Sequence, residues 1–335
     1  MFNKIYEKIK LFIKENIKFL ISLVFIIIIF TYELPYCIYT PGGKVDLSKR
    51  IEVESGYDYD GEISMAYVSM VKSSLPFIVL SYIIPNWDLQ KQSDVSYDNF
   101  TLDETLEIDK IYMQEGINNA ILSAYKLAGK QVTVKGNKLK VVYLEENSKS
   151  NLKINDEILS VDNTKVSSVD EIRDVLKNKN DKDKVMVKII RKGKIKEINS
   201  TLTLINNEPK LGIATVSLLD LKTNPKVEVK TKSSESGSSG GLMMSLAIYN
   251  SLVKEDITKK DLIMGTGTID SSGKVGKIDG VKYKLLGATK KKADVFLCPK
   301  ENYKEAVKVK KDNDLNIEIK SVETLQEAIE YLESR

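Results

Sequence analysis

Residues 237–248 read Gly-Ser-Ser-Gly-Gly-Leu-Met-Met-Ser-Leu-Ala-Ile, a pair of serines between glycines that runs directly into an apolar segment of helical character. Lys284 follows further on, in the apolar stripe of a second predicted helix, and the chain contains no histidine. A serine hydroxyl becomes a good nucleophile only when a base takes its proton. Without imidazole, the side chain that can do this near neutral pH is an amine with a lowered pKa. The pattern therefore predicts a Ser/Lys hydrolase and excludes Ser-His-Asp, Cys-His and imidazole-zinc sites.

The composition is that of a globular protein of two or three domains. Of the 335 residues, 42% are hydrophobic and 29% are charged, which leaves enough apolar side chains for a core. The 51 basic and 47 acidic residues give a net charge of +4, too small to favour nucleic acid as a partner. Cys37 and Cys298 lie in apolar segments and are predicted to be structural thiols. We expect neither a metal nor a cofactor.

Residues 267–274 have only a faint likeness to a phosphate-binding loop. The spacing between Gly267 and Gly273 does not fit such a loop, and Val275 lacks the hydroxyl that would bind magnesium. No nucleotide is therefore expected as a ligand.

The N-terminal segment predicts a membrane anchor. Residues 19–38 are almost continuously apolar, with Glu33 and Pro35 as interruptions, which is about the length that a spanning helix needs. Residues 1–18 are basic, so the positive-inside rule places them in the cytoplasm and places the catalytic part outside it. A cleaved signal peptide is the competing interpretation, but no small-x-small cleavage site follows the apolar run. We therefore expect a single-pass protein of the cell membrane.

Residues 132–204 have the pattern of a small β-rich domain. Short predicted strands and hairpin turns surround one helix, whose apolar face carries Val169, Ile172 and Leu176. The run 152–166, in which an acidic pair precedes Ile-Leu-Ser-Val and a turn, resembles the core signature of PDZ domains. No Gly-Leu-Gly-Phe loop for a carboxylate is visible. Binding of extended segments by strand addition stays open, as does a role in spacing or packing alone.

An α/β pattern flanks this module on both sides. Apolar residues at helical spacing predict a helix over 104–128, with Gly129 as its C-terminal stop. From residue 241 onward, helices and strands alternate, and Ser321 is the expected N-cap of the last helix. The predicted elements of this part are helices over 241–253, from 281 and from 301, strands at 261–265, 294–298 and 315–319, and a closing helix.

Three ordered blocks of the C-terminal part resemble the proteolytic domain of Lon proteases. They are the segments 237–246, 265–269 and 273–286, and the likeness covers most of residues 230–335. Together with the predicted anchor and the PDZ-like module, the chain is similar to the membrane-anchored, PDZ-containing Lon-like peptidases of bacteria. The resemblance implies an α/β (α+β) fold of Lon type with a small β-rich domain inserted and one N-terminal transmembrane helix.

The same resemblance implies which residues carry the chemistry. The nucleophile of the Lon pattern falls on Ser239, the general base on Lys284, and the threonine that holds the lysine on Thr266. Backbone N–H groups around Ser239 would form the oxyanion hole, and Gly237, Ser238 and Gly240 would support that loop. Lys282 is expected to point elsewhere, into solvent. The chain departs from the pattern at four positions, where Ser238, Gly240, Ser236 and Thr268 replace a proline, an alanine, an aspartate and a glutamate.

The resemblance also predicts a split domain. The stretch after the PDZ-like module, residues 205–335, is short for a Lon proteolytic domain, and the helix ending at residue 128 resembles a Lon helix that precedes the serine segment. We therefore expect residues 45–130 and 205–335 to form one domain with residues 132–204 inserted.

Two functions fit the sequence. The favoured one is an ATP-independent, membrane-tethered serine endopeptidase that cleaves secreted peptides or extracytoplasmic parts of membrane proteins. The alternative is an inactive envelope scaffold that binds extended peptides through the PDZ-like module. Separately, residues 233–241 are rich in serine and glycine, so a flexible linker is the competing interpretation of that segment. The expected partners are a peptide or protein substrate and the membrane. The sequence predicts neither the natural substrate nor the oligomeric state.

Overall fold

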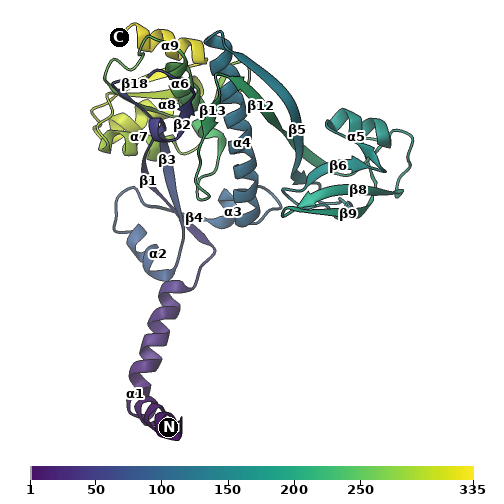
Figure 1. Ribbon diagram of the computed structural model, residues 1–335. Coiled ribbons are helices and arrows are strands. Elements are labelled where there is room, and N and C mark those ends of the chain that lie inside the picture. Colours follow the sequence, from purple (N-terminus) through teal and green to yellow (C-terminus); the bar gives the residue numbers. More distant parts are fainter. Residues whose placement is uncertain (1) are drawn as a thin grey trace.

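The computed structural model describes residues 2–335, which form an N-terminal helix, an α/β body and a smaller β-rich domain (Figure 1). The body is built on a six-stranded sheet in the order β18-β17-β14-β3-β1-β4. β14 is parallel to β3 and β17, and β17 is parallel to β18, whereas β1 is antiparallel to β3 and β4. The strands are β1 (Tyr36–Asp46), β3 (Glu62–Lys72), β4 (Asp88–Lys91), β14 (Leu262–Gly265), β17 (Val295–Pro299) and β18 (Glu318–Val322).

Helices cover both faces of this sheet, because side chains along a strand alternate between its faces. In β17, Val295 and Leu297 belong to the core that packs against α4, α6 and α9, whereas Phe296 and Cys298 belong to the core beneath α7 and α8. The helices are α4 (Leu102–Leu127), α6 (Gly241–Leu252), α7 (Val281–Lys290), α8 (Tyr303–Asp312) and α9 (Leu325–Glu333). Helix α6 is buried almost all round, as its uniformly apolar sequence requires.

The sheet joins segments from both sides of the β-rich domain. Ile63 of β3 lies beside Ile263 of β14, although the whole β-rich domain separates them in sequence. Ala120 and Ala124 of α4 pack in the same core as Leu242 and Leu246 of α6. These contacts support the proposal that the two flanking segments fold as one unit.

The β-rich domain has its own sheet and core. Its strand order is β12-β5-β6-β8-β9, with β7 paired to β6, and the helix α5 (Val169–Leu176) packs on it. The two longest strands, β5 and β12, form a ribbon that reaches back to the body, where Val132 and Leu221 pack against the main core. The strands are β5 (Gln131–Leu144), β6 (Glu157–Val161), β7 (Thr164–Lys165), β8 (Lys184–Arg191), β9 (Lys194–Thr201) and β12 (Ile213–Asn224).

Asn118 of α4 fixes this ribbon to the body. Its side-chain amide donates to the carbonyl oxygen of Leu219 at 3.1 Å, and its side-chain oxygen accepts from the N–H of Leu219 at 2.8 Å. The remaining short elements are α2 (Leu75–Ser81), α3 (Gln92–Val95), β2 (Ile51–Val53), β10 (Thr203–Ile205), β11 (Glu208–Lys210), β13 (Val227–Val229), β15 (Thr268–Ile269), β16 (Val275–Gly276) and the 3₁₀ turns Leu47–Lys49, Ser238–Gly240 and Lys300–Asn302.

Several predicted boundaries move in the structure. The predicted strand at 315–319 lies at Glu318–Val322, because this register pairs it with the whole length of β17. The N-cap of the last helix is therefore Thr324, whose side chain accepts from the N–H of Glu327, and the prediction of Ser321 is wrong. The helix predicted over 104–128 is confirmed as α4. It ends just before Gly129, and this glycine adopts the left-handed conformation.

The N-terminal helix corrects the predicted anchor. Helix α1 (Phe2–Thr31) ends well before residue 38, and Cys37 and Ile38 lie buried in β1. The apolar part of α1, residues 19–31, is about 20 Å long at 1.5 Å per residue, whereas the hydrocarbon core of a bilayer is about 30 Å thick. Among residues 2–335, the structure holds no helix that is both long enough and apolar enough to cross a membrane. The predicted spanning helix over 19–38 is therefore wrong.

Candidate active site

Ser239 lies in the 3₁₀ turn Ser238–Gly240, which leads directly into α6. Gly237 before it has φ 90°, a conformation that glycine adopts without strain. The carbonyl oxygen of Ser239 accepts two hydrogen bonds, from the N–H of Gly267 at 2.8 Å and from the hydroxyl of Thr266 at 3.0 Å. The serine loop is thus held against the segment that follows β14, although its many serines and glycines alone would favour a flexible loop.

Lys284 reaches Ser239 from α7 on the other side. Its Nζ lies 2.9 Å from Oγ of Ser239 and 3.1 Å from Oγ1 of Thr266. Thr266 therefore contacts both partners, because its hydroxyl donates to the carbonyl of Ser239 and accepts from the amine of Lys284. The structure brings together the three side chains that the sequence singled out.

Burial sets the charge of the amine. The side chain of Lys284 is buried, and the residue is only 4% exposed. Removal from water disfavours the ammonium form and lowers the pKa of Lys284 to about 8, although the nearby carboxylate of Asp279 acts in the opposite direction. At pH 7 roughly a tenth of the amine is then neutral, against well under a thousandth for an ordinary lysine. Ser239, by contrast, is partly exposed and can be reached.

Gly240 accounts for one departure from the Lon pattern. A Cβ at this position would lie 2.7 Å from Sδ of Met65, a side chain that comes from β3. In this chain the methionine occupies the space that the methyl group of an alanine would need. The absence of a side chain at Gly240 thus leaves room for the side chain of Met65, which packs directly against the backbone of the turn.

Helix α4 supports the serine loop in a way that the sequence did not reveal. The carbonyl oxygen of Asp109 accepts from the N–H of Gly237 at 3.0 Å, and the hydroxyl of Tyr97 donates to the carboxylate of Asp109 at 2.7 Å. Burial raises the pKa of Asp109. Gly116, about two turns further along α4, packs against Ser238. No local pattern marks these residues, since they lie more than 100 positions before the serine.

Lys282, on the same helix as Lys284, takes a different partner. Its Nζ donates to a carboxylate oxygen of Asp88 in β4 at 2.6 Å, and the side chain is about one third exposed. Lys282 thus makes an ion pair at the edge of the sheet and is not the free surface lysine that the sequence predicts. It provides a natural comparison for Lys284.

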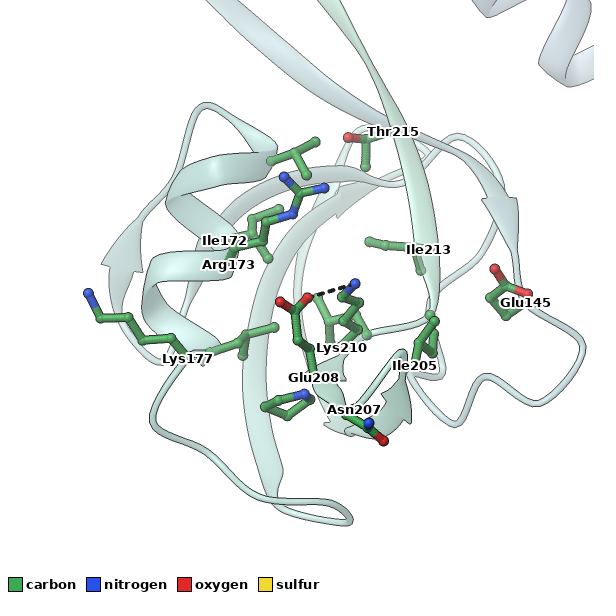
Figure 2. A pocket seen from close by; sticks show the side chains of 15 residues that line it. Glu145, Ile172, Arg173, Lys177, Ile205, Asn207, Glu208, Lys210, Ile213 and Thr215 are labelled. Atoms are coloured by element: carbon green, nitrogen blue, oxygen red, sulfur yellow. Dashed lines mark ion pairs between the residues drawn. The ribbon is translucent and has the colours of Figure 1, made fainter.

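A second candidate site lies in the β-rich domain, away from the serine (Figure 2). A cavity of about 470 Å³ opens between α5, the hairpin formed by β10 and β11, and the start of β12. Ile172 and Arg173 of α5 face Ile213 across it, and Lys210 forms an ion pair with Glu208 at 2.8 Å. Within residues 2–335, β12 is an edge strand that pairs only with β5, so its other edge is available along this groove.

The turn that leads into this edge strand lies beyond the predicted end of the module. Gly212 has φ 66°, and its carbonyl accepts from the N–H of Glu145 at 2.9 Å. Residues 132–204 contain no Gly-Leu-Gly-Phe loop that could bind a carboxylate. The turn at Leu211 and Gly212, which closes one end of the groove, follows that range.

Family models match two parts of the chain. Residues 230–334 match the C-terminal proteolytic domain of Lon protease (S16), and residues 127–202 match the PDZ domain. Among curated proteins, Lon protease of Campylobacter jejuni is 38% identical over 96 residues, which are 28% of this chain and 12% of that protein. Lon protease 2 of Borreliella burgdorferi is 29% identical over 116 residues, 34% of this chain and 14% of that protein. The chain thus spans about an eighth of the length of these relatives.

Solved structures also resemble part of the chain. The PDZ domain of the SdrC-like protein from Listeria monocytogenes is 24% identical, covers 26% of this chain and 93% of its own, and has a TM-score of 0.23. The corresponding PDZ domain from Listeria innocua is 24% identical, covers 23% and 92%, and has a TM-score of 0.22. Taken with the geometry around Ser239, the family matches identify residues 230–334 as a proteolytic domain of the Lon serine protease family, carried on one chain with a PDZ domain.

Proposed function

We propose that this chain is an ATP-independent serine endopeptidase in which Ser239 is the nucleophile and Lys284 the general base. The observation that carries the proposal is the 2.9 Å contact between Oγ of Ser239 and an amine that is buried and whose pKa is lowered to about 8. A hydroxyl and a neutral amine at hydrogen-bond distance are the two groups that acyl transfer needs when imidazole is absent.

The proton moves in a closed cycle. Oγ of Ser239 attacks the peptide carbonyl carbon while its proton passes to Nζ of Lys284, which becomes an ammonium. The C–N bond then breaks, and Lys284 returns the proton to the leaving amine, so that an acyl-enzyme remains. Neutral Lys284 then takes a proton from a water molecule, whose oxygen attacks the ester carbonyl carbon. The C–Oγ bond breaks, and Lys284 returns the proton to Oγ, which restores both residues. Thr266 keeps the amine aimed at the serine through both halves of the cycle.

The negative charge that develops on the carbonyl oxygen of the substrate must be stabilised by hydrogen-bond donors. The N–H of Ser239 lies at the N-terminal end of the 3₁₀ turn and α6, where the helix dipole favours negative charge. We assign it to the oxyanion hole, a position at which one donor is typically worth about 2.7 to 4 kcal/mol of barrier.

The groove of the PDZ domain gives the peptidase a second point of contact with its substrate. An extended segment added to the free edge of β12 would lie against α5, with its side chains over Val169 and Ile213. We propose that the groove binds unfolded stretches of protein in this way and keeps them close to the proteolytic domain.

The N-terminal helix would tether the enzyme to a membrane. No residue of α1 is buried against the rest of the protein, and its apolar part, residues 19–31, follows a segment with five lysines. An apolar helix end with lysines before it is suited to a lipid surface that carries negative charge. The predicted location of the catalytic part outside the cytoplasm depended on a spanning helix, so it needs a test of its own, which protease treatment of intact cells would provide.

Cleavage of an unfolded protein by the full chain in detergent tests the proposal. Ser239→Ala and Lys284→Ala should each reduce the rate at least about 1,000-fold. Lys282→Ala, two positions away on the same helix, is the matched control and should retain most of the activity. Equal cleavage by all variants would show that another protein is responsible. Absence of cleavage by the unaltered chain would leave the peptide-binding scaffold as the function.

A further inference from the structure

Residues 73–87, between β3 and β4, form an apolar projection. They contain no charged side chain, although 29% of the residues of the whole chain are charged. They include α2 (Leu75–Ser81) and the turn that follows it, and no residue of α2 is buried. Tyr82 is 81% exposed, Ile83 70% and Val79 54%, with Leu75, Phe77 and Leu80 exposed beside them.

This projection is continuous with the N-terminal helix. α1 contacts α2, and in Figure 1 the two lie together at the end of the body from which α1 extends. Leu34, which follows α1, donates its N–H to the carbonyl of Ser73 just before α2. The apolar side chains at the C-terminal end of α1, residues 19–31, and those of residues 75–84 thus lie next to each other, with Glu33, Lys72 and Asp88 as the charged residues beside them.

We propose that residues 75–84 dock into the interface of a lipid bilayer, as a second membrane contact beside α1. This inference rests on the tethering of α1 that was proposed above. Once α1 lies in a bilayer, the projection beside it is carried to the same surface. Its composition fits that surface, since it offers aliphatic side chains to the acyl region and Tyr82 and Trp87 to the headgroup level, where such rings concentrate.

A second copy of the chain or a protein partner is a less suitable occupant. Specific protein interfaces surround an apolar centre with a polar rim that supplies several hydrogen bonds. The side chains from Leu75 to Ile83 offer only the hydroxyls of Ser81 and Tyr82, and that of Ser81 already donates to the carbonyl of Ile78. A fluid lipid phase makes no such demand on its contacts.

Docking would also orient the proteolytic domain. The projection continues into β4, whose Asp88 pairs with Lys282 of α7, the helix that carries Lys284. Two contacts, at α1 and at residues 75–84, restrict rotation about the tether far more than one contact does. The face of the body that holds β4 and α7 is then kept at a fixed height above the bilayer.

The single tryptophan of the chain, Trp87, reports on this docking without any label. The full chain is reconstituted in vesicles of phosphatidylcholine and phosphatidylglycerol, and its fluorescence is compared with that in vesicles brominated near the glycerol end of the acyl chains. We expect a blue-shifted emission and at least a twofold loss of intensity with the brominated lipid. The double variant Val79→Asp/Ile83→Asp should lose the quenching while still floating with the vesicles through α1. Ile195→Asp, at a position 63% exposed in the PDZ domain, should quench like the unaltered chain.

Each outcome decides between the two membrane contacts. Flotation without quenching of Trp87 overturns the docking of residues 75–84 and leaves the tether by α1 intact. Failure to float overturns both. A blue shift that depends on protein concentration and appears without lipid shows that a second copy of the chain covers the projection, and it also overturns the proposal.

Discussion

The PDZ domain and the proteolytic body are built from the chain in opposite ways. The sheet and core of the PDZ domain come from one continuous stretch, residues 131–224. The body takes β1, β3 and α4 from before that stretch, and α6, β14 and α7 from after it. The serine loop shows the consequence, because it rests on Thr266 from the second segment and on Asp109 from the first.

The catalytic site and the groove of the PDZ domain also differ, one being enclosed by distant segments and the other open on one strand. Lys284 is almost completely removed from water, which is what lowers its pKa, and it is enclosed by elements that are distant in sequence. The groove of the PDZ domain is open, and what it offers is the unpaired edge of one strand. A base must be held in a dry, rigid environment, whereas a binding edge must stay accessible. A change in one of these regions should therefore leave the other unchanged.

The largest effect concerns folding. A fragment of residues 205–335 lacks β3 and α4, so the apolar face of α6 and one edge of β14 lose their partners. We expect it to show no cooperative unfolding transition in urea, whereas a fragment of residues 131–224, with its own core, should show one. Cooperative unfolding of the isolated 205–335 fragment would refute the split domain.

Replacement of the base by another cation should abolish catalysis. Arginine keeps the positive charge but cannot be deprotonated in a protein, so Lys284→Arg should reduce kcat/KM for a peptide at least about 1,000-fold at every pH. Lys282→Arg can retain its pairing with Asp88 and should stay within about twofold. Comparable losses in the two variants would mean that α7 is sensitive to any change and that Lys284 has no special role.

The pH dependence follows from the pKa of Lys284. The base acts in its neutral form, so kcat/KM should rise about tenfold per pH unit below pH 8 and level off above it. The charge of Asp279 raises this pKa, so Asp279→Asn should lower it and shift the rising limb to lower pH. A profile measured from pH 5.5 to 10 checks both statements. A shift of the rising limb to higher pH in Asp279→Asn would contradict the assignment of Lys284 as the base.

Thr266 should affect the rate without affecting substrate affinity. Thr266→Val keeps the volume but removes the hydroxyl that contacts both Ser239 and Lys284, and we expect a fall of about 10- to 100-fold in kcat with KM almost unchanged. Thr266→Ser retains the hydroxyl and should recover most of the rate. If the serine variant is as slow as the valine variant, packing of the methyl group, and not orientation of the amine, explains the loss.

The sequence predicted those parts of the site that one short segment defines. The absence of histidine limits the base to an amine, and the glycines around Ser239 and the apolar stripe around Lys284 are local patterns. Thr266 came from the resemblance to Lon proteases. The support from Tyr97 and Asp109 could not be predicted, because it depends on how α4 packs against a loop far away in the chain. The groove was missed for a similar reason, since its edge strand β12 begins after the predicted end of the module.

The anchor shows the limit of a pattern based on hydropathy. Residues 32–38 continue the apolar run, so a window of average hydropathy extends the helix through them. In the structure, the main sheet takes up that stretch instead, because Cys37 and Ile38 pair with β3 and are buried in the body. Hydropathy measures how favourable it is to remove a segment from water, and burial in a protein core removes it from water as well as insertion into lipid does. Tertiary structure decides between the two.

The smallest effect should arise at the groove. Val169 lines it from the first turn of α5 and is 40% exposed, so Val169→Asp places a charge where an added strand would lie without disturbing the core. For an unfolded protein that occupies both sites, we expect KM to rise about 3- to 10-fold with kcat unchanged, because only one of two contacts is weakened. A short peptide that reaches only Ser239 should be cleaved as before. Equal loss with both substrates would mean that the PDZ domain supports the proteolytic body structurally, and that the two regions are less independent than their separate cores indicate.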